Sequence, residues 1–205
     1  MTRPPQPLDA SREGRLVAAA ARAFTDVGYE LASLNAITAE AGWAKSSFYH
    51  YFPDKQRLHD HVVATLRAAA ARRVVPADLS LVDSRDYWPE VSRVLALLMI
   101  AVADDEDARM LARMFTQPLA ARGPTGSLTR LRGDVRDWLG DWLRHGQGLG
   151  LVRRDLPLDL LRDMVSGTVS GALQWVAETG QVSDGEPDRV ADALRGLVGV
   201  TAARS

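Results

Sequence analysis

Apolar residues recur every three or four positions along almost the whole chain, and no stretch alternates convincingly with the period of two that a half-buried strand requires. The segment GQGLGLVRRDLP (146–157) is only a weak strand candidate. The sequence therefore predicts an all-α fold.

Glycines, prolines and helix caps divide this pattern into segments. Residues 1–10 contain three prolines and predict a mobile tail. A unit of three short helices is predicted over residues 11–53, and its caps and stops are Ser11, Gly28, Ser33, Gly42 and Pro53. Longer helices are predicted over residues 54–73, 84–103, 105–117, 126–146, 157–179 and 187–203. We therefore expect about nine helices, with 54–73 connecting the first unit to a larger bundle.

The composition is that of a globular chain with a sizeable core, because 46% of its 205 residues are hydrophobic and 25% are charged. No apolar run reaches the roughly 18 residues that span a bilayer, and MTRPPQPLDA lacks the apolar centre of a signal peptide. The absence of cysteine excludes disulfides and thiolate metal sites and fits a reducing cytosol. We therefore expect a cytoplasmic protein without a membrane partner.

One short segment, AGWAKSSFYHYFPDKQRL (41–58), differs from the rest of the chain. It holds five of the thirteen aromatic residues and the only two lysines among 25 basic residues. On the predicted third helix, Phe48 and Phe52 fall on one side and can bury, whereas Lys45 and Tyr49 form a row on another face. The tight turn before this helix gives the geometry of a helix-turn-helix.

The polar side of that helix suits DNA. Its lysine can donate to guanine or to a phosphate, its serines allow close backbone approach, and its phenols are good phosphate donors. Lys55 lies in the first turn of the next helix, where a bound phosphate would offset its conflict with the helix dipole. Because the formal net charge is −1, any such surface must be local. The predicted contacts to double-stranded DNA are Ser33, Asn35, Lys45, Ser46, Ser47, Tyr49, His50, Tyr51 and Lys55.

The segment AFTDVGYELASLNAITAEAGWAKSSFYHYFPDKQRL resembles the helix-turn-helix of TetR-family transcriptional regulators, over about residues 11–60. The matching positions are Phe24, Gly28-Tyr29, Ser33, Ile37, Ala41-Gly42, Lys45, Phe48-Tyr49-His50-Tyr51-Phe52 and Lys55. A looser similarity to the family's penultimate helix lies in LVRRDLPLDLLRDMVSGTVSGALQWVAETG. The resemblance implies an all-helical homodimer that represses transcription until a small molecule binds its C-terminal domain.

The segment departs from the family pattern at three positions. Trp43 stands where valine is usual, Ala44 where a serine often caps the recognition helix, and Ser46 where glycine is common. An alanine in the cap position costs about 0.5–2 kcal/mol of helix stability, and packing of Trp43 is expected to recover part of this. The departures bear on the operator sequence and not on the mode of binding.

Two other groups of side chains are weaker candidates. Ser46, His50 and Asp54 have the spacing of a hydrolase triad, but a proline breaks the helix and no oxyanion site is evident. His59 and His61 are two apart on different helix faces, which makes a poor metal pair. We expect no catalytic residue, metal or cofactor.

The bundle carries four of the five tryptophans and several methionines at helical spacing. Core packing is the simpler explanation for any one of them, but together with the resemblance they predict a cavity for an apolar or aromatic ligand. The predicted lining residues are Trp88, Met99, Met110, Arg113, Met114, Gln117, Trp138, Trp142 and Gln174. Arg113, Gln117 and Gln174 are the predicted polar groups among them.

Small residues in two of the predicted helices favour a homodimer, since they let another backbone approach closely. The alternative is contact within the chain. The predicted interface consists of Ser166, Gly167, Ser170, Gly171, Leu194, Leu197 and Val198.

The residues and the resemblance together predict a ligand-responsive transcriptional regulator. Residues 11–53 are the predicted DNA-binding domain and residues 54–205 the predicted ligand-binding and dimerisation domain. The leading hypothesis is a repressor that a small apolar or aromatic effector releases from a palindromic operator, and activation stays open as an alternative. The competing class is a helical-bundle carrier or enzyme without DNA binding, which is disfavoured because no polar constellation in the bundle resembles a catalytic site.

Overall fold

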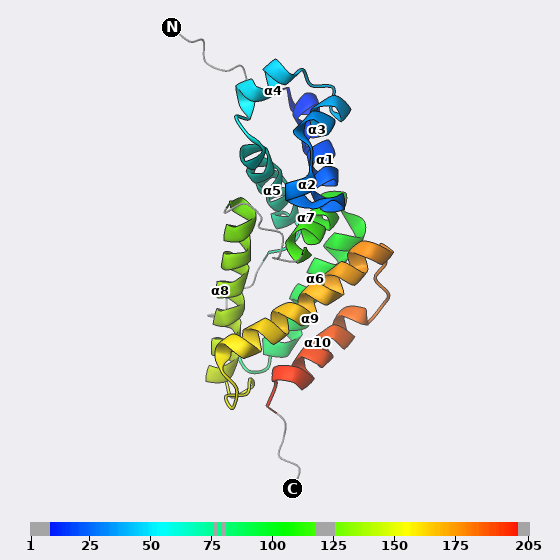
Figure 1. Cartoon of the computed structure of the whole chain (residues 1–205). Coiled ribbons are helices and arrows are strands. Elements are labelled where there is room, and N and C mark those ends of the chain that lie inside the picture. The colour runs from blue at the N-terminus through cyan, green and yellow to red at the C-terminus, as the bar shows by residue number, and fades with distance from the viewer. Residues whose placement is uncertain (1–8, 76–77, 79–80, 118–125, 201–205) are drawn as a thin grey trace.

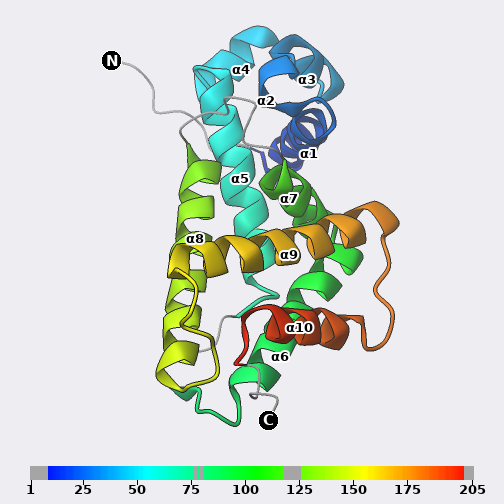
Figure 2. The same ribbon diagram turned by 60° about the horizontal axis from the view of Figure 1, so that its bottom comes forward.

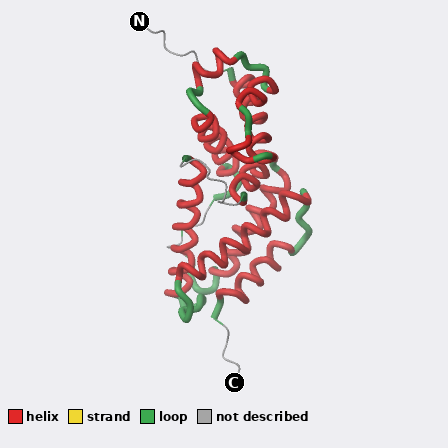
Figure 3. Tube along the Cα trace, viewed as in Figure 1, coloured by secondary structure: helices red, strands yellow, loops and turns green. Residues whose placement is uncertain are grey.

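The structure is a computed structural model that describes residues 9–75, 78, 81–117 and 126–200. The regular elements in these residues are helices, together with one isolated bridge pair (Figure 3). The helices are α1 (Ala10–Asp26), α2 (Gly28–Leu31), α3 (Leu34–Glu40), α4 (Lys45–Tyr51), α5 (Lys55–Ala71), α6 (Tyr87–Asp104), α7 (Glu106–Thr116), α8 (Ser127–Gly148), α9 (Leu158–Thr179) and α10 (Glu186–Val198). The predicted all-α fold is confirmed.

The molecule is elongated, and the short helices lie at one end (Figure 1). Helices α1 to α4 form that end, α5 runs from it toward the bundle, and α7 packs on both α1 and α5. The turned view in Figure 2 shows α9 crossing the bundle between α8 and α7, with α10 lying along α6. The N-terminal unit and the bundle are therefore joined through α5 and α7.

Side-chain caps define the helix starts in the N-terminal unit. Asp9, and not Ser11 as predicted, caps α1, because its carboxylate accepts a hydrogen bond from the Ser11 backbone N–H at 3.3 Å. Ser33 caps α3 as predicted, and Asp54 caps α5 by accepting from a first-turn N–H at 2.8 Å. Asp54 is thus already engaged with its own helix.

A further short helix, α2, makes ten helices in the described residues where about nine are predicted. Gly28 ends α1 as expected and has a φ of +79°, in the left-handed region that glycine tolerates. The chain then makes one extra turn, closed by a 3.1 Å hydrogen bond from the Ala32 N–H to the Gly28 carbonyl. A single turn of this kind carries too few apolar positions to show a helical period in the sequence.

The last helix is shorter than predicted and ends at Val198 instead of near residue 203. Beyond it, Gly199 forms an isolated antiparallel bridge with Val152. The carbonyl of Val198 also accepts from the Arg153 N–H at 2.9 Å. The weak strand candidate before α9 therefore yields one bridge pair, which closes the chain end against the loop after α8.

Buried apolar side chains gather in two main clusters. The first fills the N-terminal unit, and its largest fully buried members include Leu16, Phe24, Ile37, Phe48 and Leu58. Met110 and Met114 of α7 belong to this first cluster as well. The second lies between α6, α8, α9 and α10 around Trp142 and Leu161. The first core therefore continues past residue 53, where a domain boundary is predicted, into α5 and α7.

Candidate DNA-binding surface and effector cavity

Helices α3 and α4 are joined by a tight turn over residues 41–44. The Trp43 N–H donates to the Thr38 carbonyl at 2.8 Å, and Gly42 has a φ of +69°. A glycine in the left-handed region at the end of a helix lets the chain reverse without strain. Ala44, at the cap position of α4, makes no side-chain capping hydrogen bond, as predicted.

Trp43 fixes this turn onto α1. Its side chain is 5% exposed, its indole N–H donates to the Arg12 carbonyl at 3.2 Å, and the Arg12 guanidinium lies 4.8 Å from the ring centre. Phe48 and Phe52 are also buried, and their ring centres lie 5.6 Å apart. The predicted core role of all three aromatic residues is confirmed. They hold α4 so that its other side faces solvent.

The side of α4 that faces solvent carries Lys45, Ser46, Tyr49 and His50, which we call the recognition face. All four are exposed, Tyr49 with 53% of its surface, whereas Ser47 is half-buried. The face combines a cation, hydroxyl groups and an imidazole on one helix of a helix-turn-helix, which are donors that fit phosphates and base edges in a major groove.

Lys55 is held by its own chain. Its ammonium group donates to the carbonyl oxygens of Glu30 and Ala32 at 3.0 and 3.1 Å and lies 4.7 Å from the centre of the Tyr29 ring. These contacts tie the start of α5 to α2. Lys55 therefore has a structural role that the sequence did not reveal, and its predicted phosphate contact stays a prediction.

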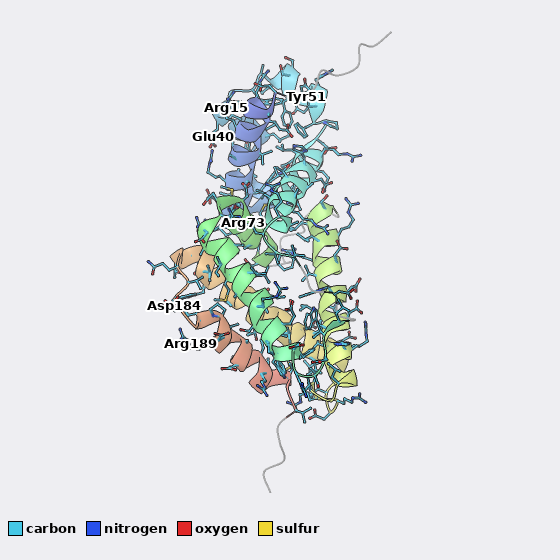
Figure 4. The ribbon with its side chains drawn as sticks, turned by 180° about the vertical axis from the view of Figure 1, so that it is seen from behind. Arg15, Glu40, Tyr51, Arg73, Asp184 and Arg189 are labelled. Carbon is cyan, nitrogen blue, oxygen red and sulfur yellow. The ribbon has the colours of Figure 1, made fainter. Side chains whose placement is uncertain are left out.

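The remaining predicted DNA contacts lie around the recognition face without joining it. Asn35 is exposed in the first turn of α3, and Ser33 is exposed while its hydroxyl oxygen caps that helix. Tyr51 is half-buried, and its ring packs edge-on at 5.8 Å against Trp43. Seen from behind in Figure 4, Tyr51 lies at the end of the molecule formed by α1 to α4. Contact of these three residues with DNA stays a prediction.

His59 lies buried where α5 packs against α1 and α2. It is 2% exposed, its ring centre lies 5.0 Å from that of Phe24 and 5.3 Å from that of Tyr29, and its Nδ1 has no hydrogen-bond partner. Burial lowers the pKa of His59 to about 4, so that the ring is neutral near pH 7. His59 therefore acts as a core residue at the junction.

The C-terminal end of α7 connects the bundle directly to α1. The Gln117 amide donates to the carbonyls of Phe24 and Thr25, both at 3.0 Å. Arg132 of α8 in turn donates to the carbonyls of Met114, Phe115 and Gln117 at 2.8–3.2 Å. Burial lowers the pKa of this half-buried guanidinium. The last turn of α7 is thus clamped between the N-terminal unit and α8.

The bundle contains a partly open cavity of about 510 Å³. Its wall is almost entirely apolar and comes from α5, α6, α7, α8, α9 and α10, with Leu95, Leu98, Phe115, Leu139, Val169 and Leu173 among the lining residues. The aromatic side chains of Tyr87, Trp88, Trp138 and Trp142 also line it. A concave apolar site of this size with few polar groups is typical of a small-molecule site.

Three of the nine predicted lining residues, the tryptophans at 88, 138 and 142, do line the cavity. The other six do not. Met110 and Met114 turn toward the N-terminal core, and Met99 packs in a third cluster with Val176. The three polar residues of the prediction are bonded elsewhere: Arg113 to the Ala177 carbonyl, Gln117 to α1, and Gln174 to Glu178.

Four of the seven predicted interface residues face inward. Ser166, Ser170, Leu194 and Val198 line the cavity. Leu197 is half-buried against the second core cluster. Only Gly167 and Gly171 lie on the exposed side of α9, and a Cβ added at either would meet nothing within 4 Å. Of the predicted interface residues, the two glycines of α9 are therefore exposed, and the predicted interface itself stays a prediction.

Sequence reasoning also missed residues of the cavity wall and of the exposed side of α9. The cavity wall is mostly leucine and valine, and its best signal is α6, which is apolar on most sides (YWPEVSRVLALLMIAVAD). On α9, Leu160 is 47% exposed and Trp175 is 44% exposed, at helical spacing from the two glycines. Both large apolar side chains therefore lie on the same exposed side of α9 as the glycines.

Over the described residues, no helix is both long and apolar enough to cross a membrane. The same part of the chain contains no cluster of three or more histidine, aspartate or glutamate side chains arranged to hold a metal ion. His59 and His61, the weak metal pair of the sequence, lie against aromatic rings and Glu13 instead.

The family model described as "Bacterial regulatory proteins, tetR family" matches residues 16–62, from α1 into α5. Among solved structures, a TetR-like transcriptional regulator from Rhodococcus sp. RHA1 is 20% identical, with a TM-score of 0.66 over 94% of this chain and 96% of that one. The fatty acid degradation regulator FadR from Bacillus halodurans is 18% identical, with a TM-score of 0.65 over 89% and 97%.

The ketosteroid transcriptional regulator KstR2 of Mycobacterium tuberculosis is 19% identical, with a TM-score of 0.64 over 95% and 98%. No curated protein sequence matches the chain. At these identities the structures show a shared fold, and the family match covers the helix-turn-helix that presents the recognition face. Residues 16–62 therefore match the tetR family of bacterial regulatory proteins, and the chain as a whole has the fold of TetR-like regulators.

Proposed function

We propose that the protein is a homodimeric transcriptional repressor that a small apolar effector releases from a palindromic operator. The observation that carries this proposal is the presence of an exposed recognition face and an apolar cavity in one molecule, joined through α5 and α7. The match of residues 16–62 to a family of regulatory proteins disfavours the carrier or enzyme alternative.

A dimer would place one recognition face in each half-site of a palindrome. The exposed stripe of Leu160, Gly167, Gly171 and Trp175 on α9 supports such a dimer, because small residues let a partner helix come close and the larger apolar side chains would then be covered. Helix α10 lies beside α9 and can extend the same surface (Figure 1).

An effector in the cavity would act through α7 and α5. Ala108, Leu111, Ala112 and Phe115 of α7 line the cavity, while Met110 and Met114 of the same helix belong to the N-terminal core. A shift of α7 would therefore displace side chains in the core of the helix-turn-helix. Repression is released when the effector binds the non-DNA-binding conformation more tightly, with a coupling of about 1–3 kcal/mol typical of allosteric proteins.

The proposed effector is apolar or aromatic, because the cavity wall is. Two structural relatives carry names that concern apolar molecules, namely fatty acid degradation and ketosteroids. This supports an apolar effector for the present chain without identifying it.

The decisive experiment is a mobility-shift titration against the DNA upstream of the protein's own gene. Wild-type protein should shift this DNA, and Lys45→Ala should weaken binding by about 1–3 kcal/mol and relax base preference. Arg144→Ala is the matched control, because this exposed cation lies on α8, away from α4 and outside the proposed dimer surface on α9 and α10. Wild-type affinity of Lys45→Ala would show that α4 is not the DNA-reading helix, and no shift at all would favour the carrier alternative.

The dimer has its own test. Gly171→Leu fits the single subunit, since a Cβ there meets nothing, but it would block a close partner helix. Sedimentation should show monomers for this variant and dimers for Gly133→Leu, a control on α8 where a Cβ is equally free. An unchanged dimer for Gly171→Leu would move the interface away from α9.

A further inference from the structure

We propose that the cavity binds a neutral molecule whose carbonyl or hydroxyl oxygen accepts hydrogen bonds from Ser166 and Ser170, while its apolar or aromatic body lies among the tryptophans. This inference rests on the proposed effector role of the cavity and adds the polar group by which the effector is recognised.

The two serines are the first reason. They are one helical turn apart on α9, both line the cavity, and both are half-buried. Neither hydroxyl makes a hydrogen bond within the described residues. Thr168, between them on the same helix, donates to the Met164 carbonyl at 3.0 Å in the way usual for a hydroxyl in a helix. The two serine hydroxyls are therefore free to donate into an otherwise apolar space.

The charge of the lining is the second reason. Its only charged members in the described part of the chain, Arg67 and Asp134, pair with each other at 3.1 Å and are each more than half exposed. They connect α5 and α8 and leave no net charge in the wall. A charged ligand inside would lose its hydration without gaining an opposite charge, which is costly. The cavity therefore favours a neutral ligand.

Two other polar groups of the wall are not available to a ligand. The Tyr87 hydroxyl donates to the Trp142 carbonyl at 3.1 Å, and the Trp142 indole N–H is buried away from the open space. The two serine hydroxyls are the cavity donors that lie together on one helix face, whereas the indole N–H groups of Trp88 and Trp138 belong to the aromatic rings against which the body of the ligand would lie. Because Trp138 and Trp142 come from α8 and Trp88 from α6, a ligand anchored on α9 would lie against three helices at once.

Four probes with the same carbon skeleton test the inference by isothermal titration. They are butyrophenone, a neutral ketone; butylbenzene, its hydrocarbon; 4-phenylbutyrate, a carboxylate; and 4-phenylbutylammonium, a cation. Each is titrated into the wild-type protein, the double variant Ser166→Ala/Ser170→Ala, and the control Thr168→Val. The control removes a hydroxyl of the same helix that is already bonded to the backbone.

Butyrophenone should bind wild-type protein more tightly than either charged probe does. The double variant should lose about two- to tenfold of the butyrophenone affinity, the range of one or two ordinary hydrogen bonds, and should bind butylbenzene as well as wild type does. Thr168→Val should resemble wild type with all four probes. This pattern requires the hydroxyls to be ligand donors, since a general loosening of α9 would weaken butylbenzene too.

Unchanged butyrophenone affinity in the double variant would overturn the inference, and so would preferential binding of a charged probe or no binding of any probe. Failure of the proposed function is a separate result. A ketone that depends on both serines but leaves operator affinity unchanged would contradict the effector role and keep the serine anchor. A ketone that releases the operator but binds equally well without the two serine hydroxyls would contradict the serine anchor and keep the effector role.

Discussion

In the core that the N-terminal unit shares with α5, Phe24, Phe48 and Leu58 are at most 1% exposed and pack in one continuous cluster. In the bundle, Trp88 and Trp138 remain half-buried around a cavity of about 510 Å³. Protein interiors are normally close-packed, so a filled core holds its surface residues in one geometry and an unfilled one leaves room for a ligand to add contacts. The close-packed core thus supports the helices that would read DNA, and the incompletely packed core lies in the bundle, where an effector would bind.

The two regions are joined where α7 packs on α1 and α5. His59 packs α5 onto the N-terminal unit, and Gln117 bonds the end of α7 to α1. Such contacts determine how far a structural shift in the bundle would displace the recognition face. The predictions that follow test the filled region, the hollow region and the junction.

The largest effect is expected from a matched pair of leucine truncations. Leu58→Ala, fully buried in the first core, should lower the free energy of unfolding by about 2–5 kcal/mol because it opens a cavity. Leu98→Ala should cost roughly 1 kcal/mol or less, because Leu98 is half-buried and already faces the cavity, so that little new void forms. Urea denaturation measures both values, and equal losses would remove the distinction between filled and hollow cores.

A pH-dependent loss of stability is expected at the junction. Burial first of all, and Arg132 to a lesser degree, lower the pKa of His59 from 6.5 to about 4, against an opposing effect of Asp60. Since the folded pKa lies below the unfolded one, the stabilisation is complete above pH 6.5 and is lost as the pH falls toward 4. The loss should be of the order of 3 kcal/mol.

Urea denaturation at several pH values measures this dependence. His59→Leu should flatten it over the pH range 4–6.5, because the residue that titrates is gone. His50→Gln, which alters an exposed histidine of the recognition face, should retain the wild-type slope. A slope that survives in His59→Leu would assign the pH dependence to another group.

A smaller effect is expected from the link between α7 and α1. Gln117→Met keeps the length of the side chain but removes both hydrogen bonds to the α1 carbonyls, and should cost about 1–2 kcal/mol. Gln174→Met is the control, since Gln174 is exposed and bonds only to Glu178, and it should be nearly neutral. With an effector in hand, operator affinity with and without it would show whether Gln117→Met also weakens the coupling.

The smallest effect separates the two lysines. Lys55→Met should lower the free energy of unfolding by about 1 kcal/mol, because it frees two carbonyls that hold α2 to α5. Lys45→Met, at an exposed surface position without an intramolecular role, should stay within about 0.5 kcal/mol of wild type. Equal stabilities would mean that the Lys55 contacts contribute nothing, and operator affinity alone would then test its predicted phosphate contact.

Much of the helix-turn-helix was predictable because its signals are local. Side chains four apart lie on one face of a helix whatever surrounds it, so the burial of Phe48 and Phe52 and the outward position of Lys45 and Tyr49 follow from spacing alone. The cap at Ser33 is equally local. The structure changed only details here, such as the hydrogen bonds by which Lys55 holds the start of α5 to α2.

The bundle was less predictable. The hydrophobic repeat of a long helix does not determine which of its sides contacts which neighbouring helix. Successive residues turn by about 100°, so Ser166 and Ser170 face the cavity while Gly167 and Gly171, next to them in sequence, face outward. In the same way Met110 and Met114 turn from the cavity to the N-terminal core. The sequence by itself determined most of the helices, the cap at Ser33 and the exposed side of α4. Only tertiary packing decided which side of each bundle helix lines the cavity, joins the core or stays exposed, since that choice depends on residues distant in the chain.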